Sequence, residues 1–292
     1  MTWSRPSDTL PPMPGYDLHT HSTFSDGTAT PSENVRLAVE RGLAGLAVTD
    51  HDTTEGVGEA LAAAPEELEI LPGLELSAEH DGASLHVLGY WVDTEHEGLL
   101  DELRRLHDTR FRRGELIVQR LQGLGHDLSF DRVRAIAGDD LIARPHIAQA
   151  MVEGGIVATE KEAFERYISD DGPAYVPKHA LAPLDALALI RDAGGSCVLA
   201  HPGMWRGSES VPEDLIEAMA EAGMAGLEVD HPDHDEAQRA RYGALASRLR
   251  LVRTGASDCH GARYDFRLGS ETTPAELVDE LRRRATAPVT GP

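Results

Sequence analysis

The chain has 292 residues, which is enough for one large domain or for one domain that carries an insertion. Acidic residues outnumber basic ones 50 to 27, and this net charge of −23 argues against binding to long duplex nucleic acid, which needs a broad basic surface. Only two cysteines are present and no run of 18 apolar residues occurs, so neither a disulfide framework nor a membrane span is expected.

The first 15 residues are rich in proline and have neither a basic start nor an apolar stretch. They do not resemble a signal peptide, so we expect a flexible lead-in and a cytoplasmic protein.

From residue 16 onward, helical patterns alternate with short apolar strands. The stretch 31–42 (PSENVRLAVERG) has a helix start signal at Thr30 or Ser32 and ends at a glycine, and a strand pattern follows at 42–50. Residues 68–92 have the pattern of three short strands separated by Pro-Gly and Asp-Gly turns. Helix and strand alternate again at 183–202, 212–232 and 237–261, and a helical pattern at 274–286 closes the chain. This alternation predicts an α/β fold with a parallel sheet and outer helices, most simply a barrel.

The middle of the chain follows a different pattern. Residues 98–125 predict one long amphipathic helix, and shorter helical patterns follow at 130–138, 144–155 and 160–168. We therefore expect three parts, namely the lead-in (1–15), a barrel domain (16–96 and 179–292) and a helical insertion domain that caps the substrate (97–178).

Imidazoles and carboxylates interrupt six of the apolar segments, at their ends or on their inward faces. His19 and His21 are two residues apart, so on a strand both side chains point to the same face. Glu75 stands between two leucines in LPGLEL, and His86 interrupts SLHVLGY. Each such residue could be structural by itself, as a turn cap or a hydrogen-bonded core group. So many at strand ends together indicate a functional site, because the sites of α/β barrels form at those ends.

Six motifs occur in the order typical of one superfamily: DLHTHSTFSDG, VTDHDT, PGLELS, HVLGY, LAHPG and ASDCHG. They resemble the PHP (polymerase and histidinol phosphatase) superfamily, and most closely its TrpH/YciV-type phosphoesterases. ARPHIAQAM, GPAYVPK and GLEVDHP also match that subgroup, so that the resemblance covers residues 16–269. It implies a distorted (β/α)7 barrel with a helical insertion and a centre of two or three divalent metal ions.

The resemblance also implies which side chains hold the metal ions, in three groups of three. The groups are His19, His21 and Asp258; Glu75, His86 and His201, with Glu75 bridging to the first ion; and Asp26, His51 and His260. Such mixed nitrogen and oxygen ligands suit manganese, iron or zinc, with manganese favoured. Asp50 and Asp52 would orient imidazoles from behind.

A phosphate ester is the expected substrate of such a centre. Three divalent ions outweigh three carboxylates in charge, and they would activate a water molecule to attack phosphorus without any side-chain nucleophile. By the resemblance, a second phosphate would be held by Arg144, His146, Lys178 and His231. This implies 3′,5′-nucleoside bisphosphates such as pAp, losing the 5′-phosphate, and by extension the 5′ ends of short RNA. Arg110 and Arg113 on the long helix could also help to select the substrate, but a solvated helix face or an ion pair with Glu102 or Glu115 explains them equally well.

Several alternatives stay open. A histidinol-phosphate or generic phosphatase would use the same metals without a second phosphate site, and a regulatory metal-binding protein would bind them without catalysis. The nuclease module of a DNA polymerase is disfavoured, since no polymerase domain follows. Cys259 occupies a position that is often aromatic in the family and should point away from the metals. Asp230 replaces an expected tyrosine, so the resemblance does not predict in detail which side chains line the substrate at this position.

Overall fold

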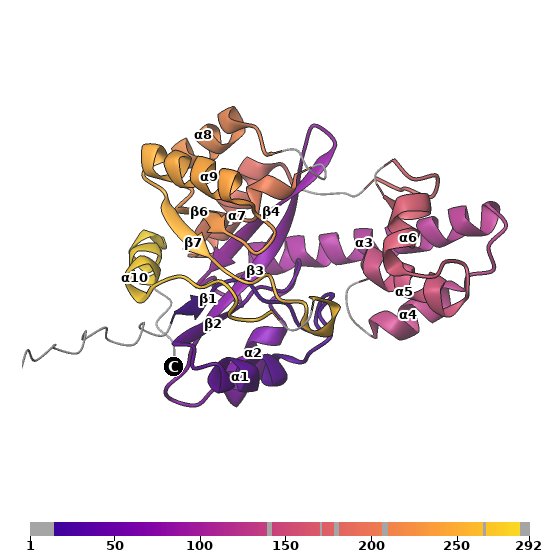
Figure 1. Ribbon diagram of the computed structural model, residues 1–292, viewed down its shortest axis with the longest axis horizontal. Coiled ribbons are helices and arrows are strands. Elements are labelled where there is room, and N and C mark those ends of the chain that lie inside the picture. The colour runs from indigo at the N-terminus through magenta and orange to yellow at the C-terminus, as the bar shows by residue number, and fades with distance from the viewer. Residues whose placement is uncertain are drawn as a thin grey trace, which may run out of the picture.

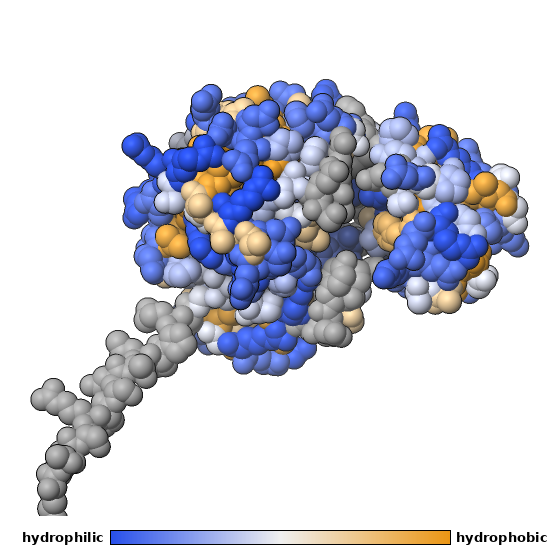
Figure 2. Space-filling view, turned by 45° about the horizontal axis from the view of Figure 1, so that its top comes forward, coloured by the Kyte–Doolittle hydropathy of each residue, from blue (hydrophilic) through white to orange (hydrophobic). Residues whose placement is uncertain are grey.

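The computed structural model describes residues 15–138, 142–169, 171–177, 181–205, 210–264 and 267–286. Figure 1 shows them as a larger lobe built around a sheet and a smaller lobe of helices, with the long helix α3 (Glu97–Gly123) running from one to the other. The space-filling view in Figure 2 shows the same two lobes under a largely hydrophilic surface.

The sheet of the larger lobe is a nearly closed barrel, as the sequence predicts. Among the described residues it has seven strands, which lie side by side in chain order. They are β1 (Tyr16–Asp17), β2 (Gly45–Val48), β3 (Glu69–His80), β4 (Ala83–Tyr90), β5 (Ser196–Leu199), β6 (Gly226–Asp230) and β7 (Val252–Gly255). At the seam, the chain beyond β7 meets the β1 segment through isolated bridges, Thr20 with Cys259 and Tyr16 with Thr273.

Strand β4 departs from the expected parallel arrangement, because it runs antiparallel to both β3 and β5. The predicted Asp-Gly turn makes this reversal: Asp81 and Gly82 have φ angles of 50° and 76°, as a tight hairpin requires. The predicted Pro-Gly turn was wrong. Pro72 and Gly73 lie inside β3, where Pro72 is the last partner of β2 and Gly73 the first partner of β4.

The helices of the barrel lobe pack outside the sheet (Figure 1) and begin at recognisable signals. They are α1 (Pro31–Glu40), α2 (Gly56–Ala63), α7 (Pro183–Asp192), α8 (Glu213–Glu221), α9 (Glu236–Leu249) and α10 (Ala275–Arg284), with the 3₁₀ turns η2 (Pro202–Met204) and η3 (Gly261–Tyr264). At the start of α1, Thr30 and Glu33 form a capping box, which confirms the predicted start. The largest apolar core lies between β3, β4 and β5 and helices α7, α8 and α9.

The insertion contains α3, α4 (Phe130–Ala137), α5 (Arg144–Glu153), α6 (Glu160–Ala163) and the π-helical turn η1 (Phe164–Ile168), close to the predicted ranges. These helices enclose an apolar core of their own, which includes Ile117, Leu121 and Met151. None of the described helices is both long and apolar enough to cross a bilayer. The exact division into domains stays a prediction.

Two leucines of α7 test the core of the barrel lobe. Leu187 is 1% exposed in the main core, whereas Leu184 on the same helix is 44% exposed. We expect Leu187→Ala to lower the free energy of unfolding by about 2–5 kcal/mol, because it removes buried methyl groups and leaves a cavity. Leu184→Ala, the matched control, should change it by less than about 0.5 kcal/mol. Urea denaturation measures both, and equal losses would contradict the assigned packing.

Candidate metal centre

The structure brings the nine expected ligand side chains together at one end of the barrel. They come from the segments after β1, β2, β5 and β7 and from within β3 and β4. Their ligand atoms form four groups, each within 4.8 Å: His21, Asp26, His51 and His260; His19, Glu75 and His201; His19, His21 and Asp258; His51, Glu75 and His86. The third equals an expected grouping, the first contains one (Asp26, His51 and His260) together with His21, and the other two cross between expected groupings, because the cluster is continuous. The role of each side chain as a ligand stays a prediction.

Glu75 is the centre of this cluster. Its side chain is fully buried, and its two oxygens face imidazoles on different sides. Oε2 lies 2.8 Å from His51 Nδ1, 3.3 Å from His19 Nε2 and 3.4 Å from His21 Nε2, while Oε1 lies 3.0 Å from His86 Nδ1 and 3.1 Å from His201 Nε2. A carboxylate placed between two sets of imidazoles would help to hold more than one divalent ion.

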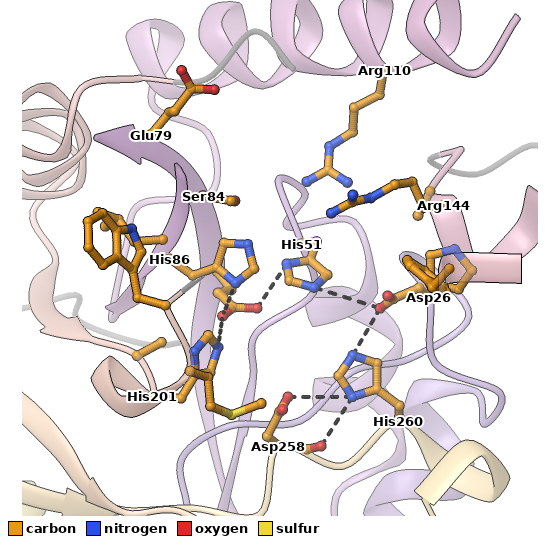
Figure 3. A pocket seen from close by; sticks show the side chains of 18 of the residues that line it. Asp26, His51, Glu79, Ser84, His86, Arg110, Arg144, His201, Asp258 and His260 are labelled. Atoms are coloured by element: carbon orange, nitrogen blue, oxygen red, sulfur yellow. Dashed lines mark hydrogen bonds and ion pairs between the residues drawn. The ribbon is translucent and has the colours of Figure 1, made fainter. Parts of the chain in front are cut away.

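Two further carboxylates complete the cluster on the side of β7. Asp258 Oδ1 lies 3.2 Å from His21 Nε2 and 3.4 Å from His260 Nδ1. Asp26 Oδ1 lies 3.2 Å from His260 Nε2. Figure 3 shows His260 between these two carboxylates, at the floor of the cavity. His21, stacked on His260 with ring centroids 4.0 Å apart, links this group to Glu75.

The pKa shifts of His260 and Glu75 show that the carboxylates of the cluster favour positive charge beside them. Burial alone would lower the pKa of His260, but Asp26 and Asp258 raise it to about 9. Burial would likewise raise the pKa of Glu75, but the imidazoles of His51, His86 and His19 hold it well below its ordinary value. The carboxylates therefore stay ionised and favour cations beside them, either protons on imidazoles or divalent ions.

The buried polar atoms of the cluster test whether metal ions fit there. Several of them lie close to a neighbouring polar atom but make no hydrogen bond of acceptable geometry with any described residue: His19 Nε2, both ring nitrogens of His21, Asp26 Oδ1, His51 Nδ1 and Glu75 Oε2. Buried polar atoms without hydrogen bonds are unfavourable, and these converge on common points. Nitrogen and oxygen donors in this arrangement suit divalent transition metals. The residues therefore fit the metal ions that the sequence implies, and the group can bind them.

Glu228, which the sequence analysis missed, supports two of the expected ligands, His19 and His201, from behind. It is fully buried in β6, where Oε1 lies 3.1 Å from His19 Nδ1 and Oε2 accepts the backbone N–H of His201 at 2.7 Å. Burial would raise its pKa, but His19 is the main group that lowers it, to about 2. The available signal was a charged residue between Leu227 and Val229, the same pattern that marked Glu75.

The hydrogen bonds that the structure gives for Asp50 and Asp52 come from backbone, hydroxyl and guanidinium groups rather than from imidazoles. Asp50 accepts the Ser22 N–H and the hydroxyls of Ser22 and Ser25, which fixes the turn from His21 to Asp26. Asp52 accepts the backbone N–H of Ser77 at 2.7 Å and the guanidinium of Arg110. Both carboxylates thus act on the chain that carries the ligands.

The residues expected at a second phosphate are dispersed. His231 is fully buried behind the centre, with Nε2 3.3 Å from Asp258 Oδ2, so it contacts a ligand. His146 Nδ1 accepts the Ala143 N–H and caps α5. Arg144 lines the cavity, while Lys178 lies outside the described residues. Asp230 pairs with Arg253 at 2.6 and 2.7 Å and is not among the described residues that line the cavity.

The cavity in front of the cluster has a volume of about 440 Å³ and lies between the barrel and the insertion. The metal-binding cluster lines one side, and Arg110, Arg113 and Arg144 line the other. Figure 3 shows Arg110 and Arg144 pointing toward the histidines. Arg110 is only 9% exposed, so the alternative of a solvated helix face is wrong for it. Cys259 packs into an apolar cluster with Leu46, away from the cavity as expected.

Known proteins resemble this chain over most of its length. A family model of the PHP domain matches residues 17–152. A 3′,5′-nucleoside bisphosphate phosphatase from Chromobacterium violaceum is 33% identical over 85% of this chain and 88% of its own length. The 5′-3′ exoribonuclease Rnm from Salmonella typhimurium is 32% identical over 84% of this chain and 85% of its own length. The solved structure of an inferred metal-dependent phosphoesterase from Bifidobacterium adolescentis has a TM-score of 0.88 and 35% identity, covering 94% of this chain and 98% of that one.

Glu228→Gln tests the support behind the ligands. The substitution keeps the shape of the side chain but removes the charge that holds His19. We expect the affinity for Mn²⁺ to fall about 10- to 100-fold, as when other hydrogen-bond partners of metal ligands are changed. Isothermal titration calorimetry measures this, with Glu236→Gln on the exposed face of α9 as the control. Equal affinities of both variants and wild type would contradict the role of Glu228.

Metal binding should also depend on pH. An imidazole coordinates a metal only when its ring nitrogen is free of a proton, and its ordinary pKa is about 6.5. We expect the Mn²⁺ affinity to fall as the pH decreases from about 8 to about 6, with protons released on binding. Calorimetry at one pH in buffers of different ionisation enthalpy counts these protons. An affinity that stays constant over this range would exclude the histidines as ligands.

Proposed function

Because this chain belongs to the PHP domain family, and is a metal-dependent hydrolase acting on phosphoesters, we propose that its substrate is a small nucleotide with phosphates at both its 3′ and 5′ positions. The observation that carries the proposal is the two-sided cavity, with the metal-binding cluster on one side and the arginines of the insertion on the other. Its volume of about 440 Å³ is in the range of sites for molecules of this size.

The metal-binding cluster and the arginines would contact different phosphates of such a substrate. Bound divalent ions would neutralise the charge of the reacting phosphate and lower the pKa of a water molecule that attacks phosphorus. Glu75, buried among the imidazoles, fixes the spacing of the cluster. Arg144 can form a bidentate pair with a second phosphate, while Arg113, which lies over the ring of Tyr175, adds positive charge. The helical insertion (97–178) thus acts as the cap over the substrate.

The names of the two relatives suggest which phosphate reacts. A 5′-3′ exoribonuclease acts on the phosphorus that follows the first nucleotide, and this phosphorus is attached to the 3′ oxygen of that nucleotide. In a 3′,5′-bisphosphate the matching group is the 3′-phosphate. Although the sequence alone led us to expect loss of the 5′-phosphate, we propose that the 3′-linked phosphate lies at the metals and the 5′-phosphate at the arginines. The 5′ end of a short RNA fits the same arrangement and is our second candidate substrate.

A hydrolysis screen of the Mn²⁺-loaded protein tests the proposal. The substrates are pAp, AMP, a short 5′-phosphorylated RNA, histidinol phosphate and an aryl phosphate. We expect the highest kcat/KM for pAp or the RNA, and 5′-AMP rather than 3′-AMP as the product of pAp. A preference for histidinol phosphate or for the aryl phosphate would favour a phosphatase without a second phosphate site. Metal binding without hydrolysis of any of them would favour a regulatory protein.

Arg144→Ala tests the second phosphate. A charged hydrogen bond of this kind contributes about 1.5–3 kcal/mol, so kcat/KM for pAp should fall about ten- to a hundredfold. Hydrolysis of the aryl phosphate, which has no second phosphate, should be nearly unchanged. Equal losses for both substrates would assign Arg144 to the fold, where it also donates to the Ile168 carbonyl at 3.1 Å. Arg132→Ala, on an exposed arginine of the same lobe, is the matched control.

A further inference from the structure

We propose that Arg110 is a positioning residue that couples the docking of helix α3 to the metal ligands His51 and Glu75. The inference rests on the proposed function, because it assumes that these two side chains bind metal. Under this proposal, Arg110 affects the metal affinity of the centre through Asp52, and it does so even when no substrate is bound.

Arg110 joins three separate parts of the chain at one point. Its Nη2 donates to Asp52 Oδ2 and, at 2.6 Å, to the hydroxyl of Ser77. Asp52 belongs to the loop after β2, Ser77 to β3, and Arg110 to α3 of the insertion. The side chains are nearly closed off from solvent, with Arg110 9% and Asp52 2% exposed. An ion pair buried in this way is held far more rigidly than a surface pair, since little water competes for it.

Asp52 transmits this contact to the two ligands through the backbone. It directly follows His51, and its N–H donates to the carbonyl of Glu75 at 3.0 Å. His51 and Glu75 themselves form an isolated parallel bridge. The Asp52 carboxylate extends this pairing by one more step, because Oδ1 accepts the N–H of Ser77 at 2.7 Å. A shift of the Asp52 side chain therefore moves the loop that carries His51 against the strand that carries Glu75.

The backbone at Asp52 indicates that this arrangement is held in place by its surroundings. Its φ angle is 52°, in the left-handed region that residues other than glycine seldom adopt. Such a conformation persists only where neighbouring contacts impose it, and it is often found beside functional sites. Three contacts of Asp52 that hold it there are those with the Glu75 carbonyl, the Ser77 N–H and the Arg110 guanidinium. Of these three, only Arg110 comes from the insertion, so it makes the geometry of the centre depend on the position of α3.

The test measures Mn²⁺ affinity by isothermal titration calorimetry in the absence of substrate. Arg110→Gln and Asp52→Asn should each lower the affinity about tenfold, at the low end of effects seen for groups behind metal ligands. The double variant should lose no more than either single variant, because both changes break one interaction. Arg110→Lys should recover part of the loss by keeping the charge. Arg112→Gln, an exposed arginine on the same helix, is the matched control and should bind like wild type.

Other results of these measurements would contradict either the role of Arg110 or the proposed metal binding. If Arg110→Gln binds Mn²⁺ like wild type and only raises KM for pAp, Arg110 is a substrate contact and the inference is wrong. Additive losses in the double variant would also overturn it. If Arg110→Gln does not fold by circular dichroism, Asp52→Asn and Arg110→Lys decide by the same measurement, and wild-type affinity in both refutes the coupling. A wild-type protein that binds no Mn²⁺ would overturn the proposed function itself, and the inference with it.

Discussion

The burial of carboxylates is the constraint on which the rest of this structure depends. Asp17, Asp50, Glu75 and Glu228 are fully shielded from solvent, and an ionised carboxylate in that position is strongly unfavourable unless cations or hydrogen-bond donors surround it. The protein meets this need in two ways. Glu75 and Glu228 face imidazoles, whereas Asp17 and Asp50 accept backbone N–H groups and hydroxyls. Glu75 and Glu228 thus belong to the metal-binding cluster and its support, whereas Asp17 and Asp50 fix the backbone that carries the cluster.

Asp17 shows why a carboxylate that fixes the backbone matters for the fold. It accepts the N–H and the hydroxyl of Ser257 and the N–H of Gly269, so it joins β1 to the chain that follows β7, where the described residues of the two segments form isolated bridges. Burial raises its pKa, and these hydrogen bonds act in the opposite direction. Ser257 precedes Asp258, and Asp17 also receives the N–H of His19 at 3.3 Å. One carboxylate therefore closes the barrel and sets two ligand-bearing segments next to each other.

The division between barrel and insertion explains how so acidic a protein can bind a phosphorylated substrate. The net charge of −23 opposes anions at long range. Salt screens charges that lie more than about 10 Å apart in water, whereas charges that line a cavity act at short range. Arg113 and Arg144 reach the cavity from α3 and α5, opposite the metal-binding cluster. A few cations at the cavity can therefore attract a phosphate despite the acidic overall composition.

Features that depend on spacing along the chain could be predicted from the amino-acid sequence. The start of α1 follows from Thr30 and Glu33, the hairpin between β3 and β4 from Asp81 and Gly82, and the importance of Glu75 from a charge among leucines, because each is a local pattern. Only the tertiary structure decided which distant groups meet. In the folded chain, Glu228 lies behind His19, and Asp50 accepts hydrogen bonds from Ser22 and Ser25. Arg110 is buried against Asp52, which is 58 residues away in the sequence. A buried polar group needs a hydrogen-bond partner, and the packing of distant segments decides which partner lies within reach. The periodicity of a single segment contains no information about how distant segments pack.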